Sequence, residues 1–206
     1  MSNTDTEKIK KRYNRVARVY DILEAPMEML AQGSLRELVF NKTEGKLLEV
    51  GIGTGKNIEY YPERVEVVGI DFSEKMLEKA RERADQTDVK VDLIEMDAQN
   101  MDFANDTFDT IVTTCVFCSV PDPIKGLKEI KRVCKPEGRV VMLEHVRSEN
   151  LILGKFMDLI NPIPVTLWGA NINRRTVDNI KEAGLKIIEV EDVASSLVKL
   201  ITAQPE

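Results

Sequence analysis

Short apolar runs alternate with segments of helical periodicity over most of the chain. Five such runs follow one another from Lys46 onward: KLLEV, VEVVGID, VKVDLIEMD, FDTIVTTCVF and GRVVMLEHV. Buried parallel strands have nearly continuous apolar sequences of this kind. Strands that alternate with helices form a sheet with right-handed crossovers. The pattern therefore predicts an α/β fold.

Two of the connecting helices have clear start signals. Ser73 is placed to cap the first helix, and Asp122 followed by Pro123 opens the second. Pro136 is expected to end the second helix, because proline cannot continue a helix interior. A further helix is expected near the N-terminus, with a basic face opposite one apolar stripe. That stripe consists of Ile9, Tyr13, Val16, Ala17 and Tyr20.

The C-terminal part follows a different pattern. Residues 151–172 are apolar but interrupted by Pro162 and Pro164, which predicts neither a clean helix nor a linker. A helix is expected over 176–183, ended by Gly184. Two last apolar runs, LKIIEVEDV and SLVKLITAQ, lie close together and are expected to pair as an antiparallel hairpin.

Composition restricts the class of protein. The 206 residues suit one domain, and 43% hydrophobic with 31% charged residues is ordinary for a globular protein rather than a membrane-embedded one. A net charge of −6 argues against nucleic acid as a partner. Three cysteines and a start without an apolar leader segment favour a cytoplasmic location.

A glycine-rich turn follows the first apolar run. The segment from Glu49 to Gly55 reads EVGIGTG, and glycines there let a ligand approach the backbone closely. A dinucleotide fingerprint would need glycine where the chain has Lys56. A phosphate-binding P-loop would need Ser or Thr where it has Asn57. Both of these ligand classes are therefore disfavoured.

Three successive strand ends each carry a carboxylate: Glu49, Asp71 and Asp97. The carboxyl ends of parallel strands meet at one edge of the sheet, where ligands bind. Each carboxylate taken singly could also be a helix cap or a solvated turn residue. Together they predict an acidic groove that accepts hydroxyl and amine groups, as a cationic nucleoside would offer.

The order EVGIGTG, GIDFS, EMDA and FDTIVTTCVF, followed by RVCKPEGRVVMLEHV, resembles the class I S-adenosylmethionine-dependent methyltransferases. The subgroup it resembles contains ubiquinone and menaquinone C-methyltransferases, phospholipid N-methyltransferases and small-molecule thiol methyltransferases. The resemblance implies a Rossmann-like three-layer sandwich with a seven-stranded, mostly parallel sheet whose last strand is antiparallel. The implied cofactor is S-adenosyl-L-methionine, with S-adenosyl-L-homocysteine as product.

The resemblance also implies roles for individual residues. Glu49 would interact with the methionyl ammonium, while Gly51, Gly53 and Gly55 would make room for the methionyl group. Asp71 would hold the ribose hydroxyls.

Four more cofactor contacts are implied at the following strand ends. Phe72 would lie against the adenine, and Asp97 with the backbone of Ala98 would read the adenine edge. Cys115 would offer its backbone carbonyl to the amino acid end of the cofactor.

One domain is expected over 1–206. The N-terminal helical cover would occupy 1–42, the cofactor-binding core 43–148, an acceptor-side insertion 149–175, and the final helix with the strand hairpin 176–206.

Two side chains are candidate catalytic groups. His145 ends the fifth apolar run and titrates near neutral pH, so it could act as a base, or it could be a hydrogen-bonded residue that only shapes the pocket. Tyr20 could lie near the transferred methyl, as in the resembled subgroup, or be a core aromatic. Arg174 and Arg175 could bind an acidic group on the acceptor or lie solvated on the surface.

Cys115 and Cys118 form a CxxC pair. One such pair with a single histidine cannot complete a four-ligand zinc site, so no metal is expected. Their apolar setting predicts that both thiols are packing groups.

The methyl acceptor is expected to be small and apolar or lipid-like, with an amine, a quinol carbon or a thiol as the methylated group. This follows from the apolar cover that residues 151–172 would supply, although the same stretch could cap the sheet or form a dimer interface. The apolar residues are Leu151, Ile152, Leu153, Phe156, Met157, Ile160, Val165, Leu167 and Trp168. A noncatalytic S-adenosylmethionine-binding or scaffold protein is the alternative.

The first twenty residues carry six Lys or Arg against two Asp or Glu, in a chain of net charge −6. This basic helix could be simply solvated, or it could make peripheral contact with an anionic lipid surface beside the apolar cover. The basic residues are Lys8, Lys10, Lys11, Arg12, Arg15 and Arg18. The sequence leaves the oligomeric state open.

Overall fold

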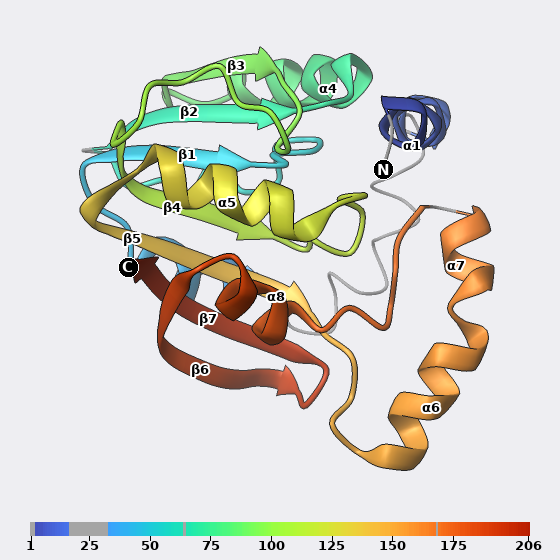
Figure 1. Ribbon diagram of the computed structural model, residues 1–206. Helices are drawn as coiled ribbons and strands as arrows, with labels where there is room; N and C mark the ends of the chain where they lie inside the picture. The colour runs from blue at the N-terminus through green and yellow to red at the C-terminus, as the bar shows by residue number, and fades with distance from the viewer. Residues whose placement is uncertain (1–2, 17–32, 64, 168) are drawn as a thin grey trace.

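A seven-stranded sheet forms the centre of the protein (Figure 1). The computed structural model describes residues 3–16, 33–63, 65–167 and 169–206. The strand order is β3-β2-β1-β4-β5-β7-β6, in which β1 to β5 pair in parallel and β7 pairs antiparallel with both β5 and β6. The strands are β1 Lys46–Val50, β2 Glu66–Asp71, β3 Val91–Glu95, β4 Phe108–Thr114, β5 Cys134–His145, β6 Leu185–Ser195 and β7 Val198–Pro205. The predicted fold class is confirmed.

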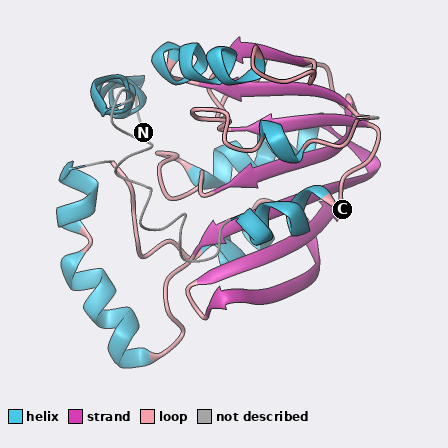
Figure 2. Cartoon of the chain, turned by 180° about the vertical axis from the view of Figure 1, so that it is seen from behind, coloured by secondary structure: helices cyan, strands magenta, loops and turns pink. Residues whose placement is uncertain are grey.

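Helices cover both faces of the sheet (Figures 1 and 2). Successive strand residues point to opposite faces, so Leu47 packs in one hydrophobic cluster with α3 and α4, whereas Leu48 packs in another with α5 and α8. This division produces the three layers of the sandwich. The helices are α1 Asn3–Val16, α3 Gly33–Phe40, α4 Glu74–Ala84, α5 Pro123–Val133, α6 Leu151–Ile160, α7 Pro162–Leu167 and α8 Thr176–Glu182, with a 3-10 turn η2 at Ile58–Tyr60.

The predicted helix starts are correct. The Ser73 hydroxyl accepts from Met76 N at 3.3 Å, and the Asp122 carboxylate accepts from Lys125 N at 3.0 Å. The predicted end of α5 at Pro136 is wrong. The helix stops at Val133, because Cys134 already has an extended backbone and begins β5.

The expectation that 151–172 contains no clean helix is also wrong, because α6 and α7 occupy most of it. Asn150 caps α6 by accepting from the backbone N–H groups of Ile152 and Leu153 at 3.0 and 3.1 Å. Pro162 and Pro164 both lie in the first turn of α7, where backbone N–H groups have no intrahelical acceptor and proline is tolerated. The prolines therefore start a second helix instead of preventing one.

The C-terminal prediction is confirmed. Gly184 has φ +79 and follows the C-cap Ala183 of α8, and β6 and β7 form the antiparallel hairpin that completes the sheet. None of the helices within the described ranges has the length and apolar character needed to cross a bilayer.

Candidate functional site

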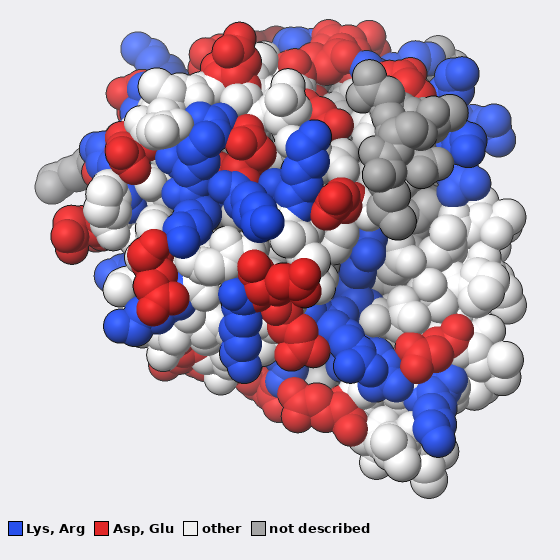
Figure 3. Space-filling view, viewed as in Figure 1, with Lys and Arg blue, Asp and Glu red and all other residues white. Residues whose placement is uncertain are grey.

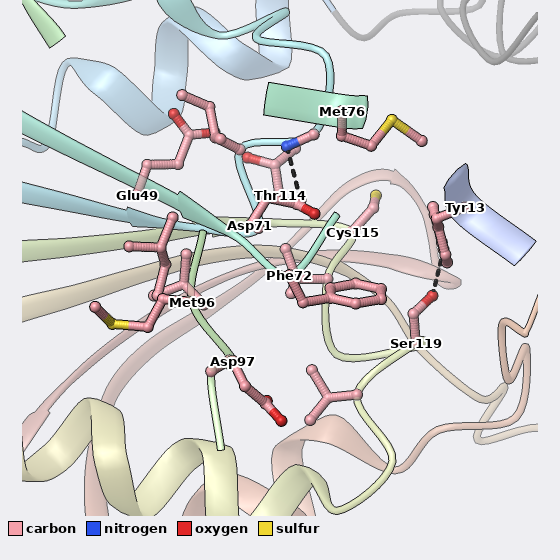
Figure 4. Close-up of a pocket in the computed structure, with 18 of the residues that line it drawn as sticks. Tyr13, Glu49, Asp71, Phe72, Met76, Met96, Asp97, Thr114, Cys115 and Ser119 are labelled. Carbon is pink, nitrogen blue, oxygen red and sulfur yellow. Dashed lines mark hydrogen bonds between the residues drawn. The ribbon is translucent and has the colours of Figure 1, made fainter. Parts of the chain in front are cut away.

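A pocket opens at the carboxyl ends of the parallel strands, beneath α1 (Figure 4). Eight of the nine predicted cofactor contacts line it, while Gly55 does not. The eight are Glu49, Gly51, Gly53, Asp71, Phe72, Asp97, Ala98 and Cys115. Four loops that are distant in sequence thus meet at one edge because each follows a parallel strand.

Each glycine of the first loop is required for a different structural reason. Gly51, Gly53 and Gly55 all have positive φ, at +71, +58 and +79. A Cβ on Gly51 would lie 2.6 Å from a Val116 methyl, whereas a Cβ on Gly53 would meet nothing within 4 Å. A Cβ on Gly55 would overlap Ile58 and Ala80. Gly53 keeps pocket space open, and Gly55 allows the loop to pack against α4.

Glu49 is buried at the base of the pocket within a hydrogen-bond network. One carboxylate oxygen accepts from Asn57 Nδ2 at 2.5 Å, and the other accepts from the hydroxyl of Tyr61. Arg36 of α3 donates to the Asn57 side-chain oxygen and lines the same pocket. Burial raises the pKa of Glu49 to about 7, although the bonds from Tyr61 and Asn57 oppose the shift. A cationic group placed beside Glu49 would favour its ionised form.

Asp71 ends β2 and is held by two backbone N–H groups. Its oxygens accept from Gly53 N at 3.0 Å and from Ser73 N at 2.9 Å. Burial raises the pKa of Asp71 to about 6, and these two bonds oppose the shift. Each carboxylate oxygen has a second lone pair, so Asp71 can still accept from ligand hydroxyls.

Asp97 is held at the next strand end. It accepts from Gln99 N at 2.8 Å and from the Thr6 hydroxyl of α1 at 3.4 Å. Ala98 lies beside it in the pocket lining. A carboxylate and a neighbouring backbone can together recognise the edge of a nucleobase.

The helix α1 lies against the pocket and contributes a residue that sequence reasoning assigned only to a core stripe. Tyr13 shares a hydrogen bond of 2.6 Å with Ser119 Oγ and meets Phe72 edge to face, with ring centroids 5.6 Å apart. Asn14 contacts Ser73 through their side-chain oxygens, 2.6 Å apart. The helical spacing predicted that Tyr13 faces inward. It did not predict that Tyr13 faces the pocket.

The CxxC prediction is half right. Cys118 is packed, and burial raises the pKa of its thiol to about 12. The prediction that Cys115 is a packing group is wrong, because this residue is exposed and lines the pocket, with φ +56. The left-handed backbone at Cys115 turns the chain outward from β4 instead of continuing the buried strand. Within the described ranges, no cluster of His, Cys, Asp or Glu could hold a metal ion.

Two side chains, Glu144 and Arg174, hold the backbone of the loop after β4 in place. Glu144 is buried in β5 and accepts from the Thr113 hydroxyl at 2.7 Å and from Val116 N and Phe117 N, each at 3.2 Å. Burial raises the pKa of Glu144 to about 7. Arg174 donates to the carbonyl oxygens of Phe117 and Val120 at 3.1 and 2.6 Å. Glu144 was not predicted from the sequence, although a carboxylate inside the apolar run GRVVMLEHV could have indicated it. The sequence predicted that Arg174 binds the acceptor or lies solvated on the surface.

The two predicted catalytic residues have different outcomes. His145 follows Glu144 at the end of β5, but it is not part of the pocket lining that the described residues form. Burial lowers the pKa of His145, and its Nδ1 is buried with no hydrogen-bond partner in the described part of the chain. Tyr20 lies outside the described residues. Both catalytic roles stay predictions.

The donor set of the pocket fits S-adenosylmethionine. Glu49 and Asp71 are carboxylates whose pKa values are raised by burial, and a cationic or hydrogen-bond-donating ligand beside them would stabilise their ionised forms. Asp97 and Phe72 add a polar edge and an aromatic face farther along the same pocket. The ammonium, ribose and adenine of the cofactor would therefore each meet a suitable group, at the ends of β1, β2 and β3 in turn.

Comparison with known proteins agrees with this chemistry. Residues 48–142 match the family model described as a methyltransferase domain. Over 107 residues, the chain is 42% identical to a phosphatidylethanolamine N-methyltransferase of Cereibacter sphaeroides, a match that covers 51% of this chain and 53% of that protein. It is also 32% identical to the ubiquinone/menaquinone biosynthesis C-methyltransferase UbiE of Geotalea daltonii, covering 67% of this chain and 63% of that one.

The matches thus span about half to two thirds of the length of these two relatives. Among solved structures, an S-adenosylmethionine-dependent methyltransferase of Thermotoga maritima has the same fold, with a TM-score of 0.70 at 21% identity, covering 96% of this chain and 100% of that one. The pocket, the family match and the fold lead to one conclusion: residues 48–142 match a methyltransferase domain, in a fold shared with an S-adenosylmethionine-dependent methyltransferase and around a pocket whose groups suit that cofactor.

Proposed function

We propose that the protein transfers a methyl group from S-adenosylmethionine to the polar end of a small, lipid-like acceptor. The observation that carries the proposal is the pocket that unites Glu49, Asp71 and Asp97 at one edge of the sheet under α1. The names of two relatives support a lipid-like acceptor. They are a phosphatidylethanolamine methyltransferase and a ubiquinone/menaquinone methyltransferase.

The cofactor supplies an activated sulfonium methyl, so the protein has to align the reactants and exclude water. Glu49 would hold the ammonium of the cofactor's methionyl group, and Asp71 would hold its ribose hydroxyls. The open space at Gly53 lets the ligand approach the backbone. Tyr13 and its hydrogen-bonded partner Ser119 close the side of the pocket nearest α1 and limit the access of water.

The acceptor would approach beside α1, where an apolar surface adjoins the pocket. Ile9, Val120 and Pro121 contribute apolar lining at this side. The methylated atom would be the nitrogen of a neutral amine, a ring carbon of a quinol whose hydroxyl has lost its proton, or the sulfur of a thiolate, since each of these is a nucleophile. The 42% identity to a phosphatidylethanolamine methyltransferase supports an amine over the other two.

The proposal is tested by turnover with methyl-labelled S-adenosylmethionine. The acceptors are phosphatidylethanolamine, a demethylated quinol, an alkyl thiol and a water-soluble amine, and the product is identified by mass. We expect label in a lipid-like product and formation of S-adenosylhomocysteine, both lost in Asp71→Ala. Label found only in the water-soluble amine would contradict the lipid-like acceptor. Cofactor binding without turnover of an extracted lipid mixture would instead favour the noncatalytic alternative, which the named relatives do not support.

We propose His145 as the base that accepts the acceptor's proton, because it ends β5 at the same edge of the sheet as the pocket, although it is not among the described lining residues. Its lowered pKa keeps the imidazole neutral, and therefore able to accept a proton, at neutral pH. We expect His145→Ala to lower kcat by about 10²-fold or more while cofactor affinity is kept. Equal kcat for the variant and the wild type would remove this role. Tyr20→Phe, measured in parallel, tests the second candidate.

A further inference from the structure

The helices α6 and α7 turn large apolar side chains toward solvent. Seven of the ten exposed large hydrophobic residues in the described part of the chain belong to these two short helices, with Ile152 at 82% and Leu159 at 77% exposure. The seven are Leu151, Ile152, Leu153, Phe156, Leu159, Ile163 and Leu167. Isolated exposed apolar residues are normal, but a contiguous group marks an interaction surface. We refer to these seven residues as the apolar face.

Few apolar side chains hold the same helices on the domain: Gly154 and Met157 are the buried residues of α6, α7 has none, and polar contacts add to them. Asp158 accepts from Arg147 at 2.8 and 3.0 Å. Asn161 donates to Asn171 at 3.1 Å and accepts from Ile172 N at 2.9 Å. This arrangement is the reverse of an ordinary surface helix, whose apolar stripe faces the core. The apolar face is therefore not needed to hold α6 and α7 on the domain.

The helix α1 brings positive charge next to the apolar face. Arg12 of α1 donates to the Val165 carbonyl of α7 at 2.5 Å, so the two helices are in direct contact. Lys11 and Arg15, four residues apart on the same helical face, are exposed, as is Lys8. Figure 3 shows Lys and Arg gathered over α1 and, next to them, an area over α6 and α7 with few charged side chains.

The charges on both sides of this surface favour a negatively charged partner. On α1, Glu7 is exposed, and Lys10 is paired with Glu95 of β3. On α6, Lys155 is exposed, and Asp158 is neutralised by Arg147. Among the side chains that the structure describes on α1 and α6, Lys8, Lys11, Arg15 and Lys155 are exposed cations, whereas the exposed anions are Glu7 and the Arg147-paired Asp158, although the whole chain carries a net charge of −6.

We propose that the apolar face inserts into the interfacial region of an anionic phospholipid bilayer, while Lys11 and Arg15 contact its head groups. Apolar residues beside basic ones are the pattern of helices that lie in a membrane interface. A second copy of the chain fits less well, because a two-fold contact joins the same patch of both copies and would bring the two basic helices together. The inference goes beyond the proposed function, since docking does not depend on which acceptor is methylated.

The proposal is tested by cosedimentation of the full chain with vesicles of phosphatidylcholine alone and of phosphatidylcholine mixed with phosphatidylglycerol. The first variant combines Ile152→Ser, Phe156→Ser and Leu159→Ser. Its matched control is Ile188→Ser with Val190→Ser, which changes exposed apolar residues of β6 away from this surface. Thermal unfolding establishes that both variants are folded.

We expect the wild type and the β6 control to bind the anionic vesicles, and the triple variant to lose at least about 10-fold in affinity. Lys11→Gln with Arg15→Gln should lose about 10- to 30-fold on anionic vesicles and little on neutral ones. Lys128→Gln with Lys186→Gln, at exposed sites on α5 and β6, should bind as the wild type does.

Three results would overturn the proposal. The first is absence of wild-type binding to either vesicle. The second is an equal loss in the triple variant and the β6 control. The third is a dimer in gel filtration that the triple variant dissociates, without any vesicle binding, which would assign the apolar face to self-association. Because vesicle binding needs neither cofactor nor turnover, its failure is distinguishable from failure of the proposed function.

Discussion

Burial determines the chemistry of the three carboxylates at the centre of the protein. It raises the pKa of Glu49 and Glu144 to about 7 and that of Asp71 to about 6. Each accepts at least two hydrogen bonds, which keep the carboxylate in place but do not offset its desolvation. These groups are thus held in position before a ligand arrives.

The raised pKa values predict how stability depends on pH. The folded state holds the Glu49 proton more tightly than the unfolded chain, so the free energy of unfolding should fall as the pH rises from about 4.5 to about 7. The decrease should be on the order of 3 kcal/mol for Glu49 alone. Denaturant unfolding of the ligand-free protein at several pH values measures it. Glu49→Gln should flatten the slope, and an unchanged slope in that variant would contradict the assignment.

Two glycines of the same loop form a matched pair. Gly51→Ala should destabilise the protein by about 2–4 kcal/mol, because strain at φ +71 adds to the overlap with Val116. Gly53→Ala should cost only about 1 kcal/mol, since its Cβ meets nothing within 4 Å, but it should weaken cofactor binding. Thermal unfolding and calorimetric titration separate the two effects. Equal destabilisation by both substitutions would contradict this account of the loop.

The site residues that were predictable from sequence are those at strand ends. Asp71 and Asp97 follow apolar runs, and the topology then brings them together. Tyr13 and Glu144 were not predictable in this way, because their roles depend on contacts with Ser119 and with the backbone of Phe117. Such contacts arise from how a distant helix and a neighbouring strand pack, which periodicity does not describe.

At the level of elements, local signals predicted where helices begin better than where they end. The caps Ser73 and Asp122 act through their own side chains, so they were visible in the sequence. The end of α5 is set by the pairing of Cys134 with Phe108 in the sheet, which overrides the expected stop at Pro136. Pro162 and Pro164 do not break a helix, because both lie in the first turn of α7.

The cap of α5 allows a direct stability measurement. Asp122→Ala should lower the free energy of unfolding by about 1 kcal/mol, because Lys125 N loses its acceptor. Asp122→Ser, which retains a capping oxygen, should recover most of the loss. Denaturant unfolding of the three proteins measures both changes. A loss that serine does not restore would mean that the carboxylate acts through something other than the cap.

For the whole molecule, the sheet topology explains why one edge carries the chemistry. The parallel strands β1, β2 and β4 deliver Glu49, Asp71 and Cys115 to the same end, and α1 crosses that end. The basic residues from Lys8 to Arg15, which stood out in the composition of the chain, lie on this helix beside the apolar face. A site for a charged cofactor and a surface suited to a lipid interface are thus neighbours.

Calorimetric titration with S-adenosylmethionine measures directly what the pocket binds. We predict saturable one-site binding to the wild type, at least about 10-fold weaker binding to Asp71→Ala with its fold intact, and no binding of NAD. Absence of saturable S-adenosylmethionine binding, or tighter binding of NAD, would contradict the account.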